Sequence, residues 1–484
     1  MLQNIEPQIV WKHFEALNAV PRPSKKEERV IQFMLDFGKG LNLETLQDDA
    51  GNVVIKKPAT KGFESRKTVV LQSHLDMVHQ KNEDTAFDFD KEGINMYVED
   101  DWVKAKGTTL GADNGLGVAA IMTVLSSDDL EHPAIEALFT IDEETGMTGA
   151  KQLDSNILKG EILLNLDTEE DDEIGIGCAG GIDLSATRFY IEESIPEHST
   201  AYNLTLKGLQ GGHSGMDIIK GLGNANKLLT RFLLQFHLKC TMRLSKFKGG
   251  GLRNAIPREA SADFVISNED LTKFEDLFNK ISTAVKAEYK SLEPNLLVNL
   301  QKAETPKSVL SSDVQDLIIK ALSAAHNGVY RMSPDIAGLV ETSNNIAQVI
   351  IENGKIDISC LTRSSVESGK WDLAHNLQSA FDLAGCQVKF SGDYPGWTPN
   401  PDSEILKVVD KLYQQKFDEK ANIAACHAGL ECGILGSHYP EMDMVSFGPT
   451  ILGAHSPDER ANISSTQKFW GFLKEILKNI PEKS

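Results

Sequence analysis

Histidine and acidic side chains close several apolar runs of this sequence. The run at 68–71 leads to His74 and Asp76, which are two positions apart and would therefore lie on the same face of a strand. Other apolar runs end in further groups of the same kind, namely Asp113, the acidic triplet 142–144, Asp167 and His455. Imidazole and carboxylate groups are the ligands with which proteins bind divalent zinc-like ions. The pattern therefore indicates metal chemistry carried by several separate parts of the chain.

The ends of these runs can meet only in a fold that brings several strand ends together. Parallel strands of an α/β sheet do this, because binding crevices form outside their carboxyl ends. The apolar patterns predict strands at 68–71, 135–141 and 161–166 and a helix at 115–125. Four groups would then surround one crevice: His74, Asp113, Glu144 and Asp167. Carboxylates gathered in this way repel one another unless cations lie between them, and with His455 the set is sufficient for two divalent ions.

Each group also has a simpler explanation when it is taken alone. A single histidine at a strand end is usually structural, and the triplet 142–144 is typical of a solvated loop or a helix start. Asp113 precedes the predicted helix and would serve as its N-cap. The order of the groups, His-x-Asp, Asp-Asn-Gly, Asp-Glu-Glu, Asp and His, makes one shared metal site the better explanation.

The spacing of strands and helices divides the chain into two expected domains. Alternating strands and helices between 52 and 166 predict an α/β catalytic domain with a mainly parallel sheet. Farther along, a β/α pattern occurs twice, which predicts an inserted α+β lid or dimerisation-type domain of two lobes. The expected boundaries are 1–184 and 392–484 for the catalytic domain and 185–391 for the lid. Near the N-terminus the tetrad 24–27, Ser-Lys-Lys-Glu, has the pattern of a capping box and predicts a helix start.

Composition excludes several classes of function. The 484 residues carry a formal net charge of −21, the wrong sign for a protein that neutralises nucleic-acid phosphates. No apolar run approaches the roughly 20 residues of a membrane span, and the N-terminus lacks the pattern of a signal peptide. The six cysteines are scattered without a CxxC pair, as is usual in a reducing compartment. A cytoplasmic protein that binds neither nucleic acid nor membrane is therefore expected.

One motif suggests a nucleotide cofactor but lacks the required context. Gly175, Gly177 and Gly180 match the spacing GxGxxG, which binds dinucleotides when a helix opens within it. The following residues, 182–191, alternate like a strand, so no helix N-terminus is available for a pyrophosphate. A glycine-rich turn near the domain boundary is the favoured interpretation.

Seven ordered motifs carry a resemblance to a known family. They are SHLDMV (73–78), GADNG (111–115), DEETG (142–146), NLDTEE (165–170), GGHSG (211–215), GLRNAIP (251–257) and ILGAHSPDE (451–459). In this order, and over essentially the whole length, the chain resembles the M20 family of dinuclear zinc peptidases, and within it the aminoacyl-histidine dipeptidases. The M28 peptidases share the order of the ligands, but GGHSG and the long insertion favour M20.

The resemblance implies how five ligands would hold two zinc ions. Asp113 is expected to bridge the ions. His74 and Asp167 would complete one site, and Glu144 and His455 the other. Mn²⁺ or Co²⁺ could replace Zn²⁺, since sites with nitrogen and oxygen ligands discriminate weakly among these ions.

The same resemblance implies roles in the chemistry for three further residues. Asp76 would fix the imidazole of His74 and raise its donor strength. Glu143 would be the general base, which takes a proton from water and gives it to the leaving amine. His213 in GGHSG would stabilise the developing oxyanion, with a turn histidine between glycines as the alternative.

The family's substrate contacts match three other positions. Asn254 and Arg363 are expected to meet the substrate, and Arg363 could clamp the carboxylate of a dipeptide. A surface salt bridge is the alternative for Arg363. Gly429 would lend backbone contacts, and for His427, two positions earlier, both substrate contact and packing remain open.

The resemblance implies hydrolysis of dipeptides that have free N- and C-termini. The preferred substrates would be Xaa-His dipeptides, including β-alanyl-His. A metal-dependent deacylase of N-acyl amino acids is the alternative on the same fold, and a non-catalytic binding protein is the third. A homodimer is one expected assembly, although a doubled lid could take the place of a second subunit's lid within one chain.

Overall fold

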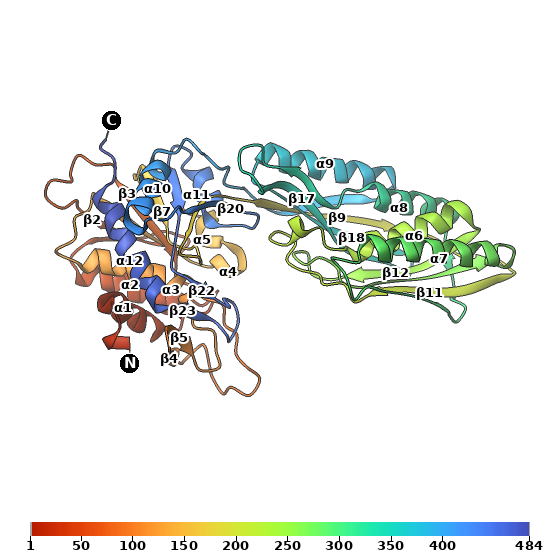
Figure 1. The fold of residues 1–484 in the computed structure, drawn as a ribbon, viewed down its shortest axis with the longest axis horizontal. Coiled ribbons are helices and arrows are strands. Elements are labelled where there is room, and N and C mark those ends of the chain that lie inside the picture. The colour runs from red at the N-terminus through yellow and green to blue at the C-terminus, as the bar shows by residue number, and fades with distance from the viewer. Residues whose placement is uncertain (1, 484) are drawn as a thin grey trace. The chain divides into compact units, whose positions relative to one another are not determined.

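The computed structural model describes residues 2–483 and divides into two compact units. Unit 1 consists of the chain up to Gly177, the segment Pro399–Ala425, and the chain from Leu430 onward. Unit 2 consists of Cys178–Thr398 and the short segment Cys426–Gly429. In Figure 1, unit 1 is drawn in reds, oranges and blues, and unit 2 mainly in greens and cyan.

Unit 1 contains α-helices around one large and one small sheet. Its helices are η1 (Leu2–Asn4), α1 (Gln8–Asn18), α2 (Glu28–Gly40), α3 (Ala112–Ser126), α4 (Glu143–Gly146), α5 (Thr148–Lys151), α10 (Glu404–Phe417), α11 (Glu431–His438) and α12 (Ile463–Lys478). Its large sheet is built from β1 (Glu44–Gln47), β2 (Val53–Lys57), β3 (Val69–His74), β6 (Ile135–Thr140), β7 (Ile162–Asn165), β8 (Glu173–Cys178), β20 (Asn422–Cys426) and β21 (Asp443–Ser446). The small sheet is built from β4 (Met96–Glu99), β5 (Trp102–Ala105), β22 (Ile451–Leu452) and β23 (Arg460–Asn462).

The large sheet of unit 1 has parallel strands at its centre. Its order is β1-β2-β6-β3-β7-β21-β8-β20, and β6, β3, β7 and β21 run parallel. The pairs β1–β2, β2–β6 and β21–β8 are antiparallel. Strands β3 and β6 are buried along their whole length, as is typical of parallel strands that are covered on both faces. The predicted α/β domain with a parallel sheet is confirmed at the centre of this sheet.

Unit 2 is an antiparallel sheet with four long helices. The helices are η2 (Ile218–Lys220), α6 (Ala225–Lys239), η3 (Asn268–Asp270), α7 (Leu271–Glu288), α8 (Ser312–Ala324) and α9 (Glu367–Leu383). The strands are β9 (Gly180–Phe189), β11 (Ser199–Lys207), β12 (Met242–Gly250), β13 (Ala260–Ser267), β14 (Leu297–Lys302), β16 (Gly328–Met332), β17 (Val340–Glu352), β18 (Lys355–Ser364) and β19 (Gln387–Tyr394). The short strands β10 (Glu192–Glu193) and β15 (Val309–Leu310) pair with each other.

The two β/α repeats of unit 2 share one sheet and one apolar core. The strand order is β14-β11-β13-β12-β17-β18-β9-β19, with β16 paired to β17. The first repeat is β11-α6-β12-β13-α7-β14, and the second combines β9 with α8-β17-β18-α9-β19. Their strand orders mirror each other across the β12–β17 pair, and residues of both repeats form a single core. Figure 1 shows α6, α7, α8 and α9 lying along this sheet. The predicted α+β class of the insertion is confirmed.

The predicted capping box at 24–27 is wrong. Helix α2 begins at Glu28, and Glu27 stands at its N-cap position without a side-chain cap. The hydroxyl of Ser24 instead donates to Oδ2 of Asp76, at 2.8 Å. The hydroxyl of Ser24 therefore binds a residue that is distant in the sequence, and not the backbone at the helix start as the local pattern predicts.

The GxGxxG segment forms strands, and no helix opens within it. Gly175 and Gly177 lie in β8 and Gly180 begins β9, so the expected glycine-rich turn is replaced by extended backbone. A Cβ at Gly180 would lie 2.5 Å from the backbone nitrogen of Gly396 and from the carbonyl of Tyr394. Close approach of two backbones, and not phosphate binding, therefore accounts for Gly180.

Among the described residues, no helix is long and apolar enough to cross a membrane.

Candidate active site

Three parallel strands end at the same level and carry the predicted site residues. Residues of β3 and β6 pair in register, so that His74 lies beside Thr140. Strand β7 follows on the other side of β3, with Asn165 beside Gln72. The loops after these strands therefore emerge at one edge of the sheet, as the sequence predicts.

Asp113 reaches this edge from the first turn of α3. Its backbone is extended (φ −78°, ψ 112°). The side-chain amide of Asn114 donates to the carbonyl of Leu166, at 2.7 Å, and joins the start of α3 to the loop after β7. Among the described residues, the hydrogen-bond partners of the Asp113 carboxylate are two histidine side chains and not the backbone N–H groups of α3. The explanation of Asp113 as a simple N-cap is therefore wrong.

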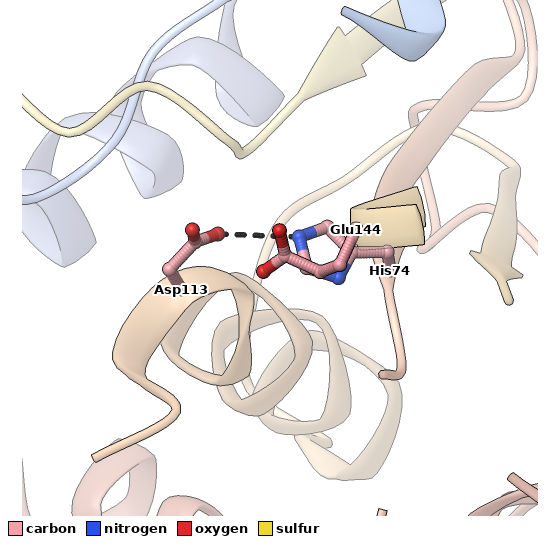
Figure 2. A group of neighbouring side chains, drawn as sticks. All are labelled: His74, Asp113 and Glu144. Carbon is pink, nitrogen blue, oxygen red and sulfur yellow. Dashed lines mark hydrogen bonds and ion pairs between the residues drawn. The ribbon is translucent and has the colours of Figure 1, made fainter. Parts of the chain in front are cut away.

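The two oxygens of Asp113 face two different histidines. Oδ1 lies 3.2 Å from Nε2 of His74, and Oδ2 lies 3.2 Å from Nε2 of His455. Figure 2 shows the carboxylate of Asp113 directed at the imidazole of His74, with Glu144 beside it. Nε2 of His74 also lies 3.5 Å from Asp167 Oδ1, and that of His455 lies 3.0 Å from Glu144 Oε2. The cluster thus forms two histidine–carboxylate groups that share one aspartate.

The donor set fits two divalent cations. The ligand atoms of His74, Asp113 and Glu144 lie within 4.8 Å of one another. Within residues 2–483, Oε1 of Glu144 and Oδ1 of Asp167 are buried without a hydrogen-bond partner, which is unfavourable unless a cation binds them. A carboxylate with one oxygen toward each group is the arrangement that bridges paired metal ions.

The acids around this cluster are buried and repel one another, and both effects raise their pKa values. Burial, together with the nearby Asp113 and Glu144, raises the pKa of Asp167 to about 6, although His74 opposes the rise. Burial likewise raises the pKa values of Glu169 and Glu431 to about 8 each. Bound cations would remove this repulsion, which is the physical reason to expect metal ions here.

Glu143 and Glu144 are adjacent but differ in their contacts. Glu144 contacts His455, whereas the carboxylate of Glu143 has no hydrogen-bond partner among the described residues. Burial raises the pKa of Glu143 well above its usual range, and the carboxylates of Asp167 and Glu144 add to the rise. An unattached carboxylate with a raised pKa is suited to accepting a proton from water.

Asp76 contacts both His74 and the loop that carries the two glutamates. Nδ1 of His74 lies 3.1 Å from the backbone carbonyl of Asp76 and 3.4 Å from its Oδ1. The carboxylate also accepts the backbone N–H groups of Glu143, at 3.0 Å, and Glu144, at 3.3 Å. Asp76 therefore joins the loop after β3 to the loop after β6.

Comparison with known proteins decides the family. Residues 70–479 match the model of peptidase family M20/M25/M40. The cytosol non-specific dipeptidase of Escherichia coli (strain K12) is 45% identical over 482 residues, covering 100% of this chain and 99% of the relative. The chain belongs to peptidase family M20/M25/M40.

Solved structures agree with this M20 assignment. Aminoacylhistidine dipeptidase from Vibrio alginolyticus has a TM-score of 0.96 and 46% identity, covering 100% of this chain and 99% of that one. Aminopeptidase PepT from Bacillus cereus shares the fold, with a TM-score of 0.57 and 16% identity over 98% of this chain and 99% of that one. The chain is accordingly a hydrolase of the M20 metallopeptidase family.

The predicted oxyanion donor and a substrate contact of this M20 peptidase lie in unit 2. Nδ1 of His213 accepts the backbone N–H groups of Gly215, at 3.3 Å, and Met216, at 3.1 Å, so its ring proton is on Nε2. Burial and the charge of Arg363 lower the pKa of His213, which keeps the ring neutral. The N–H of Ser214 donates to the carbonyl of Asn254, at 2.8 Å, and joins GGHSG to GLRNAIP.

Arg363 and His427 are buried parts of the same unit. Arg363, on β18, is 5% exposed and donates from Nη1 to the hydroxyl of Tyr394, at 2.9 Å. It forms no salt bridge within residues 2–483, so the explanation as a surface salt bridge is wrong. Nε2 of His427 lies 2.7 Å from Oγ of Ser343, and burial lowers the pKa of His427 to about 3. Gly429 closes the short segment of unit 2 that contains His427.

Four charged residues near the metal-ligand cluster were not predicted. They are Arg22, Glu169, Glu431 and Glu459. Glu431 accepts from the side chains of Gln72, at 2.7 Å, and Thr140, at 2.6 Å, beneath the strand ends. Glu169 and Glu459 occur within the NLDTEE and ILGAHSPDE motifs, which was the available signal.

Proposed function

We propose that this M20 peptidase hydrolyses dipeptides with free N- and C-termini, by means of two divalent metal ions in the cluster around Asp113. The observation that carries the proposal is that Asp113 directs one oxygen to His74 and the other to His455. The names of the two relatives support dipeptides as the substrate class. One relative is called non-specific and the other aminoacylhistidine dipeptidase; we propose a preference for Xaa-His, including β-alanyl-His.

The proposed cofactors are two zinc ions, with Mn²⁺ or Co²⁺ as substitutes. His74 and Asp167 would hold one ion, Glu144 and His455 the other, and Asp113 both. When bound, such ions activate water and polarise the scissile carbonyl. The five ligands are histidines and carboxylates, which is the ligand chemistry that zinc takes in catalytic sites.

The protein's own groups would move the protons and hold the substrate. Glu143 takes a proton from the attacking water and delivers it to the leaving amine, which its free carboxylate permits. Asp76 holds the backbone of Glu143 and Glu144 in place. His213, with its proton on Nε2, donates to the developing oxyanion.

The remaining proposed contacts bind the ends of the dipeptide. Arg363 binds the substrate carboxylate, because within residues 2–483 its Nε is buried without a hydrogen-bond partner and its guanidinium forms no salt bridge, although the charge of Asp183 is near enough to interact with it. Asn254 and Gly429 contribute further polar contacts.

The proposal extends to the domains, the assembly and the location of the protein. We assign catalysis to 1–184 and 392–484 and the lid to 185–391. We also propose a homodimer, and place the reaction in the cytoplasm by analogy with the cytosolic relative.

A comparison of free and blocked peptides tests the proposal. The metal-loaded protein is expected to release histidine from Ala-His and β-alanyl-His, and to leave N-acetyl-Ala-His intact. Treatment with a chelator should abolish the release, and added Zn²⁺ should restore it. Release of acetate or another acyl group from N-acyl amino acids, with Ala-His intact, would instead identify a deacylase. Inactivity on both classes would overturn the proposal and favour a binding protein.

A further inference from the structure

Two buried residues of opposite charge lie next to the metal-ligand cluster without belonging to it. Arg22 is 1% exposed and lies between α1 and α2, whereas Glu459 is 3% exposed and lies between β22 and β23. Both contact the backbone of Gly111. Arg22 Nη2 donates to its carbonyl at 2.5 Å, and Glu459 Oε2 accepts its N–H at 2.9 Å.

Glu459 joins the segment of one ligand to the segment of another. Its carboxylate accepts four consecutive backbone N–H groups, those of residues 110–113, at 2.7, 2.9, 2.7 and 3.2 Å. The last two of these N–H groups belong to the first residues of α3, and the first two to the residues just before it. Glu459 follows His455 by four positions in the same loop. It therefore fixes the backbone of Asp113 relative to the loop of His455.

Arg22 makes the corresponding connection to the loop after β3. Its Nη1 donates to the carbonyls of Leu75, at 2.9 Å, and Asp76, at 3.1 Å. The carbonyl of Asp76 is the one that lies 3.1 Å from Nδ1 of His74. Through Nη2 the same guanidinium holds Gly111, two positions before Asp113. One planar group thus fixes the backbone next to two ligands.

The glycines of the GADNG motif make room for this guanidinium. A Cβ at Gly111 would lie 2.6 Å from Nη2 of Arg22, and a Cβ at Gly115 would lie 2.7 Å from it. Gly111 also has a φ of +68°, which strains any residue with a side chain. The motif that carries Asp113 is therefore shaped around Arg22 as well as around the ligand itself.

We infer that Arg22 and Glu459 are positioning residues, which hold the segments of His74, Asp113 and His455 at the spacing that two divalent ions require. The inference rests on the proposed dinuclear site. Its physical basis is that metal affinity depends on ligands being held in place before the ion binds, and contacts behind the ligands supply this order. Arg22 also supplies positive charge: burial lowers its pKa to about 10, the nearby acids Glu459, Asp76, Asp113 and Glu144 oppose this fall, and the guanidinium stays charged at neutral pH.

The test compares Glu459→Gln with a matched control, Glu136→Gln. Glu136 is 5% exposed and accepts the backbone N–H groups of Lys159, at 2.7 Å, and Gly160, at 2.9 Å. It is the second residue of β6, and the ligand loops follow the other end of that strand. Both changes remove a buried carboxylate that accepts backbone N–H groups, but only Glu459 contacts the ligand segments.

Metal binding and the spectrum of the cobalt-loaded protein are the decisive measurements. We expect Glu459→Gln to weaken binding of at least one Co²⁺ by about 10- to 100-fold and to change the visible absorption bands that report cobalt geometry. Glu136→Gln should retain two ions and the wild-type spectrum even if its Tm falls by as much as that of Glu459→Gln. Arg22→Lys, which keeps the charge but loses the planar pair of donors, should behave like Glu459→Gln and serves if that variant does not fold.

Two cobalt ions and a wild-type spectrum in a folded Glu459→Gln or Arg22→Lys variant would overturn the inference, whatever its activity. Equal loss of metal in Glu136→Gln would do the same, because general destabilisation would then explain the effect. Failure of the proposed function is a separate result: a wild-type protein that binds two ions but cleaves no dipeptide. The metal titration of the variants still decides the positioning role in that case.

Discussion

Replacement of Glu143 by glutamine separates proton transfer from metal binding. The carboxylate of Glu143 has no hydrogen-bond partner among the described residues, so glutamine removes no structural contact. The contact to Asp76 uses the backbone N–H of Glu143, which glutamine keeps. The change should therefore leave both ions in place and remove only the acceptor of the proton.

The expected loss in kcat is about 10²- to 10⁴-fold, which corresponds to about 3–5 kcal/mol at roughly 1.4 kcal/mol for each factor of ten. The folded protein should not lose stability, because burial and neighbouring acids already disfavour a charge at Glu143. Steady-state kinetics on Ala-His, metal content by mass spectrometry and Tm are measured on the same preparation.

The neighbouring Glu144→Gln variant supplies the contrast. Glu144 lies 3.0 Å from His455 and has a buried oxygen without a partner, so its replacement should release metal. Loss of metal from Glu143→Gln would show that Glu143 is a ligand and would refute the division of roles. Retention of wild-type kcat would refute the assignment of the general base.

Three further predictions concern unit 2. Arg363→Ala should raise KM by about 10- to 100-fold for dipeptides with a free carboxylate, the effect of losing a strong charged hydrogen bond, and an equal rise for amidated dipeptides would contradict the clamp. His213→Ala should lower kcat by about 10²- to 10³-fold with little change in KM, and a change confined to KM would contradict its role as oxyanion donor. His427 has a folded pKa of about 3 against 6.5, so its stabilising contribution is present above pH 6.5 and declines as pH falls toward 3. Between neutral pH and pH 5, the free energy of unfolding of the wild type, measured with urea, should fall by about 2 kcal/mol more than that of His427→Gln. Equal falls would contradict a buried neutral imidazole.

The parallel centre of the sheet and the cluster of ligands were predictable because each strand brings its own signal. An apolar run followed by His74, Glu144 or Asp167 predicts both a strand and a metal-binding or catalytic group at its end. Register then follows from parallel pairing, which places the three strand ends together. The structure brings Asp113 and His455 to the same place from a helix start and a loop.

Contacts between distant segments were not predictable from local pattern. Ser24 has the spacing of a capping residue, yet its hydroxyl binds Asp76, which is 52 positions away. Arg22 follows a proline and precedes another, and nothing in the neighbouring residues indicates that Leu75 and Gly111 will surround it. Such partners are chosen by the tertiary fold, which the periodicity of a single segment does not encode.

Two carboxylates outside the proposed ligand set connect the two halves of the proposed metal centre. Asp76, which follows His74 by two positions, accepts the N–H groups of Glu143 and Glu144. Glu459, which follows His455 by four positions, accepts the N–H of Asp113.

In the proposed centre His74 and Glu144 would hold different ions. Asp76 would then connect the two sites through hydrogen bonds, whereas Asp113 would connect them as a shared ligand. The spacing of the ions would then be set by main-chain hydrogen bonds as well as by the bridge. Because these hydrogen bonds do not involve the ions, we expect the ligand segments to remain bonded to one another when one ion leaves.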